Sequence, residues 1–255
     1  MLSSTYQIVK TDNCPVCGKI VDWVSMKIPG LKKEIIIPDC NCKLNETPQS
    51  IQIKKQNRID RIQDILKKSH LPSHYDKFNL NTFPVNTTDE SQSIPQKSML
   101  SHCREYIKNW NCRQLFLWGK TGTGKSAIST IIARSIIWHS LIKTRFVTQG
   151  QMAKELSWGI NEDELKITPA SILKYYCEIP LLIIDEYSYY NSSQSERRKA
   201  FEVINLRYMN DKSTIITTND PIPQIKDPDT VRIWRRMIEK PNLQIPFSWD
   251  NLTKN

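Results

Sequence analysis

A glycine-rich octapeptide constrains the fold of this chain more than any other feature. Residues 119–126 read GKTGTGKS, which fits G-x-x-x-x-G-K-[ST] in full and holds three of the seven glycines. Glycine permits positive φ angles and close backbone approach, so the N–H groups of such a loop can converge on phosphate oxygens. The octapeptide follows the apolar segment 115–118 and opens a helical pattern over 126–141. This order of strand, loop and helix is the setting that a phosphate-binding loop requires.

The loop predicts its own ligands. Lys125 can reach the β- and γ-phosphates of a nucleotide, and the Ser126 hydroxyl can ligate Mg²⁺. The alternative, a glycine turn without a ligand, leaves Lys125 unexplained. We therefore predict that ATP and Mg²⁺ are bound here, and that the binding residues are Gly119, Lys120, Thr121, Gly122, Thr123, Gly124, Lys125 and Ser126.

Two carboxylates are expected to complete this site. The apolar segment 181–184 ends in Asp185 and Glu186, at the strand end where open α/β sheets bind ligands. Asp185 is placed to hold Mg²⁺, and Glu186 to polarise an attacking water. The alternative is a strand capped by two solvated acids. A further strand, 214–218, ends at Asn219, which can reach the γ-phosphate or the water, although Asn-Asp-Pro is also ordinary turn chemistry.

Short apolar strands alternate with helical patterns from about residue 99 onward. Such alternation predicts an α/β fold with a parallel sheet between helices. Residues 49–83 are predicted to form a helical connector, with Ile59, Ile62, Ile65 and Leu66 on one face. Its basic residues form either a solvated face or a contact with a phosphate backbone. The polar stretch 84–98, which carries two prolines, is predicted to be a loop that links this connector to the α/β domain, 99–255.

Four cysteines near the start of the chain are candidate metal ligands. No basic-then-apolar leader precedes them, so we expect a cytoplasmic protein with reduced thiols. Four thiolates suit tetrahedral Zn²⁺, which would supply the folding free energy of a small module over 1–48. A redox C-x-x-C pair and unpaired buried thiols are the alternatives, and His70 and His74 are alternative ligands. The predicted zinc ligands are Cys14, Cys17, Cys40 and Cys42.

The charge balance favours a polyanionic partner. Lys and Arg number 36 against 26 Asp and Glu, a net charge of +10, and nucleic acid is the first partner to consider. No apolar run approaches the ~18 residues that span a bilayer, so no membrane partner is expected. The segment VRIWRRM, 231–237, is either a solvated helix face or a source of arginine for the nucleotide of a neighbouring subunit.

Several motifs occur together in one order. The glycine loop is followed by IIDE (183–186), INLRY (204–208), IITTND (215–220), VRIWRRM and a closing FSWD (247–250). Together they resemble the DnaC/DnaI-type replicative helicase loaders, which are AAA+ ATPases. The segment ILKKSHLPSHYDKF, 65–78, resembles the stretch that leads into the ATPase domain of that family. The resemblance covers nearly all of residues 50–250.

The resemblance implies an ATPase that is slow without its partners. Lys125, Ser126 and Asp185 would bind ATP and Mg²⁺, Glu186 would be the catalytic glutamate, and Asn219 would be the first sensor. Arg236 matches the arginine finger best, with Arg232 as its close rival. The family often carries an arginine after the terminal aromatic-Trp-Asp motif as a second sensor, whereas this chain has Lys254 there.

The resemblance also implies partners. Loaders of the DnaI type carry a zinc-bearing N-terminal domain that docks on a hexameric replicative helicase, and the ATPase domain binds single-stranded DNA and self-associates. Trp23, Met26 and Ile28 form either a docking patch or the core of that module. The alternatives are an IstB-type transposition helper ATPase acting on duplex DNA, a non-catalytic adaptor that binds ATP as a structural ligand, and, less favoured, a small-molecule kinase.

Overall fold

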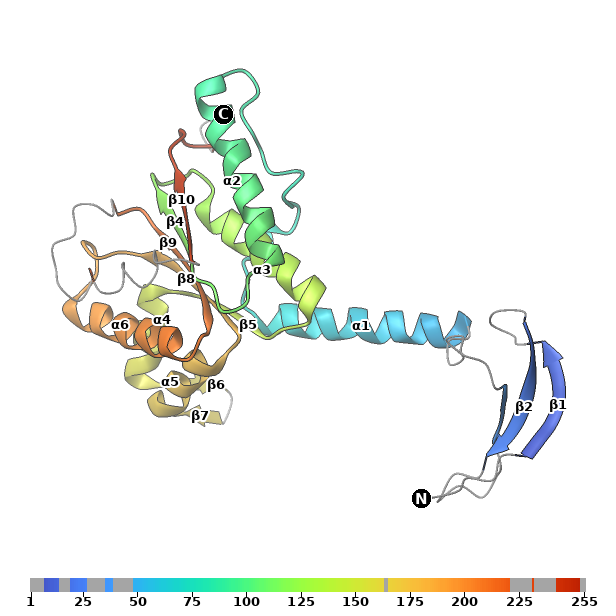
Figure 1. Cartoon of the computed structure of the whole chain (residues 1–255). Helices are drawn as coiled ribbons and strands as arrows, with labels where there is room; N and C mark the ends of the chain where they lie inside the picture. Colours follow the sequence, from blue (N-terminus) through green and yellow to red (C-terminus); the bar gives the residue numbers. More distant parts are fainter. Residues whose placement is uncertain are drawn as a thin grey trace. The chain divides into compact units, whose positions relative to one another are not determined.

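The computed structural model describes residues 7–13, 19–26, 35–38, 48–162, 165–220, 231 and 242–252. The chain divides into two compact units, 1–60 and 61–255, which are described separately below. Figure 1 shows the helices and strands of both units. In the part of the chain that is described, no helix combines the length and the apolar character needed to cross a lipid bilayer.

The first unit holds a small antiparallel sheet. Its strands β1 (Gln7–Asn13), β2 (Ile20–Met26) and β3 (Ile35–Pro38) pair in the order β1-β2-β3. Several of its apolar side chains remain exposed, such as Ile8 and Ile20. A sheet this small buries little apolar area, so its side chains alone give it a weak core.

Helix α1 (Pro48–Lys68) begins in the first unit and ends in the second. The predicted apolar face is present in part: Ile62 and Ile65 are buried and pack with Ile137, and Leu66 is partly buried against them, whereas Ile59 is exposed. The adjoining 3₁₀ turn η1 (Ser73–Tyr75) follows. The C-terminal turns of α1 are therefore anchored in the second unit.

The second unit is built on a five-stranded sheet in which every pair is parallel, which confirms the predicted α/β class. The strand order is β10-β4-β9-β8-β5, so strands far apart in sequence lie side by side. The central strands are apolar because both sheet faces are covered. Their bounds are β4 (Leu115–Gly119), β5 (Thr144–Thr148), β8 (Leu181–Tyr187), β9 (Ser213–Thr218) and β10 (Leu243–Phe247).

Helices cover both faces of this sheet (Figure 1). On one face, α2 (Glu90–Lys108) and α3 (Lys125–Ser140) bury a cluster that includes Met99 and Ile128. On the other face, α4 (Gln149–Trp158), α5 (Pro169–Glu178) and α6 (Gln194–Met209) bury a second cluster that includes Met152 and Val203. The sheet is thus the middle of three layers, and its carboxyl edge stays open between the helices.

The predicted loop over 84–98 is wrong from Glu90 onward, because α2 begins there. Asp89 caps the helix by accepting a hydrogen bond from the backbone N–H of Ser91. Gln96 is buried and its side chain accepts from the backbone N–H of Asn86, so the helix start is tied to the preceding segment. The boundary between the units also lies earlier than predicted, after Asp60.

Two further elements were not predicted. Strand β10 completes the sheet beside β4, and a two-stranded hairpin, β6 (Ile160–Glu162) and β7 (Leu165–Ile167), joins α4 to α5. Of the cysteines that the structure describes, Cys103 is buried and Cys177 is half-buried, as expected for small apolar side chains, whereas Cys112 is exposed.

Candidate active site

The glycine octapeptide forms the turn between β4 and α3. Gly119, Gly122 and Gly124 all have positive φ angles, which side chains rarely tolerate. A Cβ atom on Gly119 would stand 2.3 Å from the backbone oxygen of Phe247, so β10 approaches the loop too closely for any side chain there. The first α3 N–H groups therefore open onto a bare backbone turn, as an anion site at a helix N-terminus requires.

Lys125 lies inside this turn. Its ammonium donates hydrogen bonds to the carbonyl oxygens of Gly119 (2.8 Å) and Lys120 (2.6 Å), and its side chain is almost fully buried. Burial lowers the pKa of Lys125 to about 8, and the nearby Asp185 carboxylate opposes this shift only in part. Carbonyl oxygens thus hold the ammonium at the loop. The negative charge of a phosphate bound there would favour the protonated form of Lys125.

Asp185 joins three elements at the carboxyl edge of the sheet. Its Oδ1 accepts hydrogen bonds from the Ser126 hydroxyl (2.9 Å) at the start of α3 and from the Thr217 hydroxyl (2.6 Å) on β9. Asp185 and Thr217 are both buried. The structure therefore brings Ser126 and Asp185 together, and a hydroxyl beside a carboxylate is a donor set that suits Mg²⁺.

Glu186 follows with an unusual backbone. Its φ angle is +55°, in the left-handed region, and the register between β8 and β9 shifts between Ile184 and Tyr187. Its backbone N–H donates to the Thr217 hydroxyl (3.1 Å), while its side chain is exposed. The turn aims successive carboxylates differently: Asp185 points inward and Glu186 opens to solvent. Positive φ at a non-glycine residue is costly, and residues strained in this way cluster at functional sites.

Thr217 was not assigned a role from the sequence. Its hydroxyl contacts both acidic residues, since it donates to the Asp185 carboxylate and accepts from the backbone N–H of Glu186. Alternation along β9 offers the only signal: residue 217 points to the same side as Asn219. Thr217 thereby fixes the relative orientation of the two carboxylate-bearing residues.

These groups surround a hollow of about 120 Å³. Tyr75, from η1, lines it as well, although no role was predicted for it. Burial raises the pKa of Tyr75, and the charges of Asp185 and Glu186 raise it further, so the phenol stays protonated. The other lining residues are Thr121, Gly122, Gly124, Lys125, Ser126, Glu186, Thr217, Thr218 and Asn219.

Asn219 is exposed at the rim of this hollow, and its neighbour Asp220 is buried. The Asp220 carboxylate accepts from the backbone N–H of Tyr189 (2.6 Å) and from the Ser188 hydroxyl (3.2 Å). The turn that carries Asn219 is therefore tied to the segment that follows Glu186. This arrangement links the two strand ends that face the phosphate loop.

The segment after β10 braces the glycine loop from behind. The indole N–H of Trp249 donates to the carbonyl oxygen of Thr123 (3.0 Å), and the backbone N–H of Leu252 donates to that of Gly122 (2.9 Å). Trp249 is buried against Phe247, with ring centroids 4.7 Å apart. The closing FSWD motif is thus part of the phosphate site's support. A second hollow, of about 390 Å³, opens between this segment and residues 84–88.

Several predicted residues lie outside the described part of the chain. Where the structure is described, no cluster of three or more His, Cys, Asp or Glu side chains is placed to hold a metal ion. The predicted zinc ligands, the two candidate arginine fingers and the candidate second sensor all fall outside it: Cys14, Cys17, Cys40, Cys42, Arg232, Arg236 and Lys254.

Comparisons with known proteins place the chain among ATP-binding proteins. The family model described as "IstB-like ATP binding protein" matches residues 51–227. The insertion sequence IS232 putative ATP-binding protein of Bacillus thuringiensis subsp. berliner is 32% identical over 79% of this chain and 71% of its own length. The replicative helicase loader DnaC of Buchnera aphidicola subsp. Acyrthosiphon pisum is 22% identical over 79% of this chain and 80% of its own length.

Two further likenesses concern replication proteins. The chromosomal replication initiator DnaA of Buchnera aphidicola subsp. Baizongia pistaciae is 23% identical over 64% of this chain, which spans only 34% of that protein's length. Among solved structures, the crystal structure of the DnaC helicase loader superposes with a TM-score of 0.53 at 22% identity, covering 69% of this chain and 99% of that one. At this identity the likeness shows a shared fold.

Proposed function

Because the chain belongs to the IstB-like ATP-binding protein family, we propose that it is an ATPase that loads a hexameric replicative DNA helicase onto single-stranded DNA. The observation that carries the ATPase part is the Thr217 bridge between Asp185 and Glu186, directly across from Ser126 and the glycine loop. Helicase loading is supported by relatives named as DnaC helicase loaders.

Each residue at the hollow has a proposed role. Lys125 and the loop N–H groups bind the phosphates of ATP. Ser126 and Asp185 hold Mg²⁺, which neutralises charge on the β- and γ-phosphates. With a metal ion bound, Thr217 would still orient the Asp185 carboxylate through its hydrogen bond. Glu186, open to solvent, orients and deprotonates the attacking water, and Asn219 contacts that water or the γ-phosphate.

We propose that a neighbouring subunit completes the site. An arginine supplied in trans stabilises the charge that develops on the transferred phosphoryl group, by a factor of ~10³ or more. Arg236 is the first candidate and Arg232 the second. An isolated subunit should then hydrolyse ATP slowly, and self-association on DNA should accelerate turnover.

We propose that the first unit is a zinc module that docks on the helicase. The topology supports this. Strand β1 ends at Asn13, which directly precedes Cys14 and pairs with Ile20, the first residue of β2. Strand β3 ends at Pro38, two residues before Cys40, and Pro38 pairs with Trp23 in the middle of β2. Each cysteine pair thus closely follows a strand of a sheet in which none of the described side chains is buried, and a bound metal ion would supply folding free energy there.

A second candidate is an ATPase that assists transposition on duplex DNA. It is favoured by the 32% identity to the IS232 protein, which exceeds the 22% identity to the Buchnera DnaC. The nucleotide chemistry would be the same in both cases. The partners differ: a helicase and single-stranded DNA in one, a transposase and duplex DNA in the other.

The test uses the full chain. ATP hydrolysis per subunit is measured against protein concentration, with single-stranded DNA, duplex DNA or a hexameric replicative helicase added. We expect turnover to rise with concentration and with single-stranded DNA, and helicase capture to be lost after zinc chelation. Turnover independent of all additions would contradict the proposal. Acceleration by duplex DNA alone, without helicase capture, would establish the transposition alternative.

A further inference from the structure

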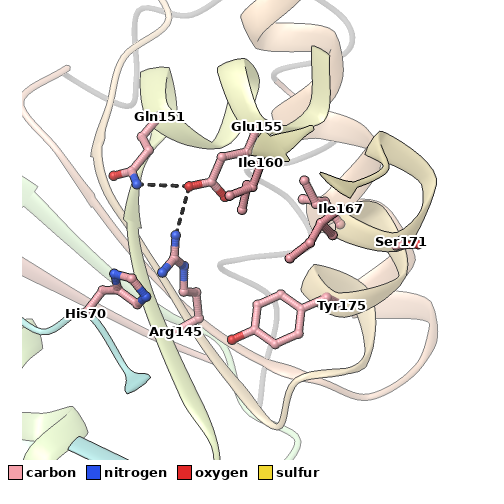
Figure 2. Close-up of a pocket in the computed structure, with 9 residues that line it drawn as sticks. His70, Arg145, Gln151, Glu155, Ile160, Ile167, Ser171 and Tyr175 are labelled. Atoms are coloured by element: carbon pink, nitrogen blue, oxygen red, sulfur yellow. Dashed lines mark hydrogen bonds and ion pairs between the residues drawn. The ribbon is translucent and has the colours of Figure 1, made fainter. Parts of the chain in front are cut away.

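A third cavity lies on the other side of strand β8 from the glycine loop, beside the edge strand β5. It measures about 340 Å³ and is bounded by β5, α4, α5 and the β6–β7 hairpin. Figure 2 shows Arg145 and Tyr175 pointing into this hollow from β5 and α5, with Ile160 and Ile167 on the opposite side. It shares no lining residue with the nucleotide hollow. The proposed ATPase chemistry therefore leaves it unexplained.

Arg145 makes this cavity unusual. Its side chain is only 6% exposed, yet among the described residues its guanidinium bonds to Glu155, where Nη2 lies 2.8 Å from Oε1. Within the same part of the chain, its Nε is enclosed and has no acceptor. Buried donors are nearly always paired, so this arginine is under-satisfied, and a ligand in the cavity could reach only the accessible part of its guanidinium.

A second buried arginine provides an internal standard. Arg207 is fully buried, and its guanidinium donates to the Thr214 hydroxyl and to three backbone carbonyl oxygens, those of Tyr176, Ile179 and Ser213. All three of its guanidinium nitrogens donate hydrogen bonds, and these bonds hold α6, the end of α5 and β9 together. Every guanidinium nitrogen of Arg207 thus has an acceptor, whereas Arg145, beside the cavity, has N–H donors without one among the described residues.

The Glu155 carboxylate indicates that a suitable ligand is neutral. It accepts hydrogen bonds from Arg145, from the Gln151 amide (2.9 Å) and from the Tyr176 hydroxyl. Arg145 and Glu155 thus form a neutral pair whose acceptor side is largely filled and whose donor side is open. An anion would meet the Glu155 carboxylate, whereas a neutral group with carbonyl oxygens would receive the free guanidinium donors without that repulsion.

The side chains that line the cavity indicate which shape of ligand it can receive. Ile160, Ile167 and Ile172 give an apolar lining, and Tyr175 presents a ring that is 44% exposed. Trp158, two residues before Ile160, is 78% exposed at the end of α4. Exposed aromatic rings are stacking platforms for unpaired bases, because every base has a π face.

We infer that this cavity receives one unpaired base of single-stranded DNA. The base places its carbonyl edge on the open donors of Arg145 and stacks against Tyr175, while neighbouring bases stack on Trp158. This inference rests on the proposed function in that the AAA+ unit binds single-stranded DNA, and it agrees with the net charge of +10. Guanidinium donors paired with base carbonyl oxygens are a common mode of base recognition.

The test compares two 20-nucleotide probes on the full chain with a non-hydrolysable ATP analogue: oligo(dT), and an abasic strand of equal length that keeps the phosphates. Ser171 lines the cavity on α5, so Ser171→Leu fills it without touching the Arg145–Glu155 pair. The matched control is Ser101→Leu on the exposed face of α2. We expect Ser171→Leu to weaken oligo(dT) binding about tenfold, as for one lost base contact, with abasic binding and DNA-free ATP hydrolysis unchanged.

A direct readout is photocrosslinking with 5-iodouracil in the oligonucleotide, followed by peptide mapping. We expect crosslinks at Tyr175 or Trp158 that disappear in Ser171→Leu. Equal binding of both probes to the wild-type chain, or equal loss of both in Ser171→Leu, would overturn the inference while leaving DNA binding intact. Loss of helicase binding alone in Ser171→Leu would overturn it too and assign the cavity to a protein partner. Binding of neither probe would refute the DNA part of the proposed function itself.

Discussion

The nucleotide hollow and the cavity beside β5 differ in how their charged groups are paired. Around the glycine loop, Lys125 and Asp185 already have partners within the protein, at 2.6–2.9 Å. In the cavity beside β5, Arg145 has one acceptor and open donors. The first site must exchange internal hydrogen bonds for ligand contacts, so it can exist in two states. The second keeps its donors open, so a ligand adds contacts without displacing any.

The largest effect is expected from Glu186→Gln. The amide keeps the size of the side chain but cannot take a proton from water, so turnover should fall by about 10²–10⁴-fold. ATP binding should be retained, because Glu186 is absent from the internal bonds of Lys125 and Asp185. Single-turnover hydrolysis and equilibrium nucleotide binding measure the two quantities. Unchanged turnover would show that Glu186 is not the base, and a variant that keeps full activity in DNA loading would favour the non-catalytic adaptor.

Arg207→Met tests whether a saturated buried arginine serves stability alone. Each buried carbonyl oxygen left without its donor costs about 1–3 kcal/mol, so the free energy of unfolding should fall by several kcal/mol. Urea denaturation measures this. Arg198→Met on the exposed side of the same helix is the control and should change stability little. If Arg207→Met were as stable as the wild type, the paired donors of Arg207 would not contribute to stability, and the contrast with Arg145 would fail.

Thr217→Val removes the hydroxyl that orients both acidic residues while keeping the shape of the side chain. Losing one such hydrogen bond is worth about 1 kcal/mol or slightly more, so turnover should fall by about tenfold and more Mg²⁺ should be needed for half-maximal rate. Thr217→Ser should restore both.

The matched control is Thr214→Val on the same strand, whose hydroxyl contacts Arg207 instead. It should lower stability but leave the Mg²⁺ dependence unchanged. If both valine variants behaved alike, Thr217 would be a structural residue and not a positioning one.

The smallest effect is a pH dependence. The pKa of Lys125 is about 8 in the folded protein, against 10.5 for the ordinary side chain. Above pH 8 the free site loses its proton and must regain it to bind phosphate, so ATP affinity should fall about fourfold between pH 7 and pH 8.5. By the same linkage, the unfolded chain holds the extra proton between pH 8 and 10.5, so stability should rise with pH there.

Calorimetry in buffers of different ionisation enthalpy measures the proton uptake at pH 8.5. Lys125→Arg, which stays charged, should abolish that uptake if it folds and binds nucleotide. A flat affinity up to pH 9 in the wild-type chain would contradict the lowered pKa.

The phosphate loop and the sheet class could be predicted because their signals are local. Residues 119–126 are contiguous, and the strands that end at Asp185 and Asn219 carry their polar residues directly after apolar runs. The parallel sheet follows from the same alternation of apolar strands and helices. A short pattern can predict a geometry when its residues are contiguous in the sequence.

The remaining features depend on distant contacts, which no local pattern encodes. The start of α2 was not predicted because the polar, proline-bearing composition of this stretch favours a loop. The Asp89 cap and the hydrogen bond of Gln96 stabilise a helix there instead. Tyr75 reaches the nucleotide hollow from a turn far from it in sequence. The cavity around Arg145 was not predicted, because it draws on β5, α4, α5 and an unforeseen hairpin.

Strand β10 has a consequence for how the protein is made. It pairs in parallel with β4, whose last residue begins the glycine loop, and the residues after it hold that loop from behind. Translation delivers β10 later than every other strand of this sheet. A nascent chain that stops before Leu243 therefore contains the whole octapeptide motif yet lacks the residues that support it, so a competent nucleotide pocket can form only after β10 has been made.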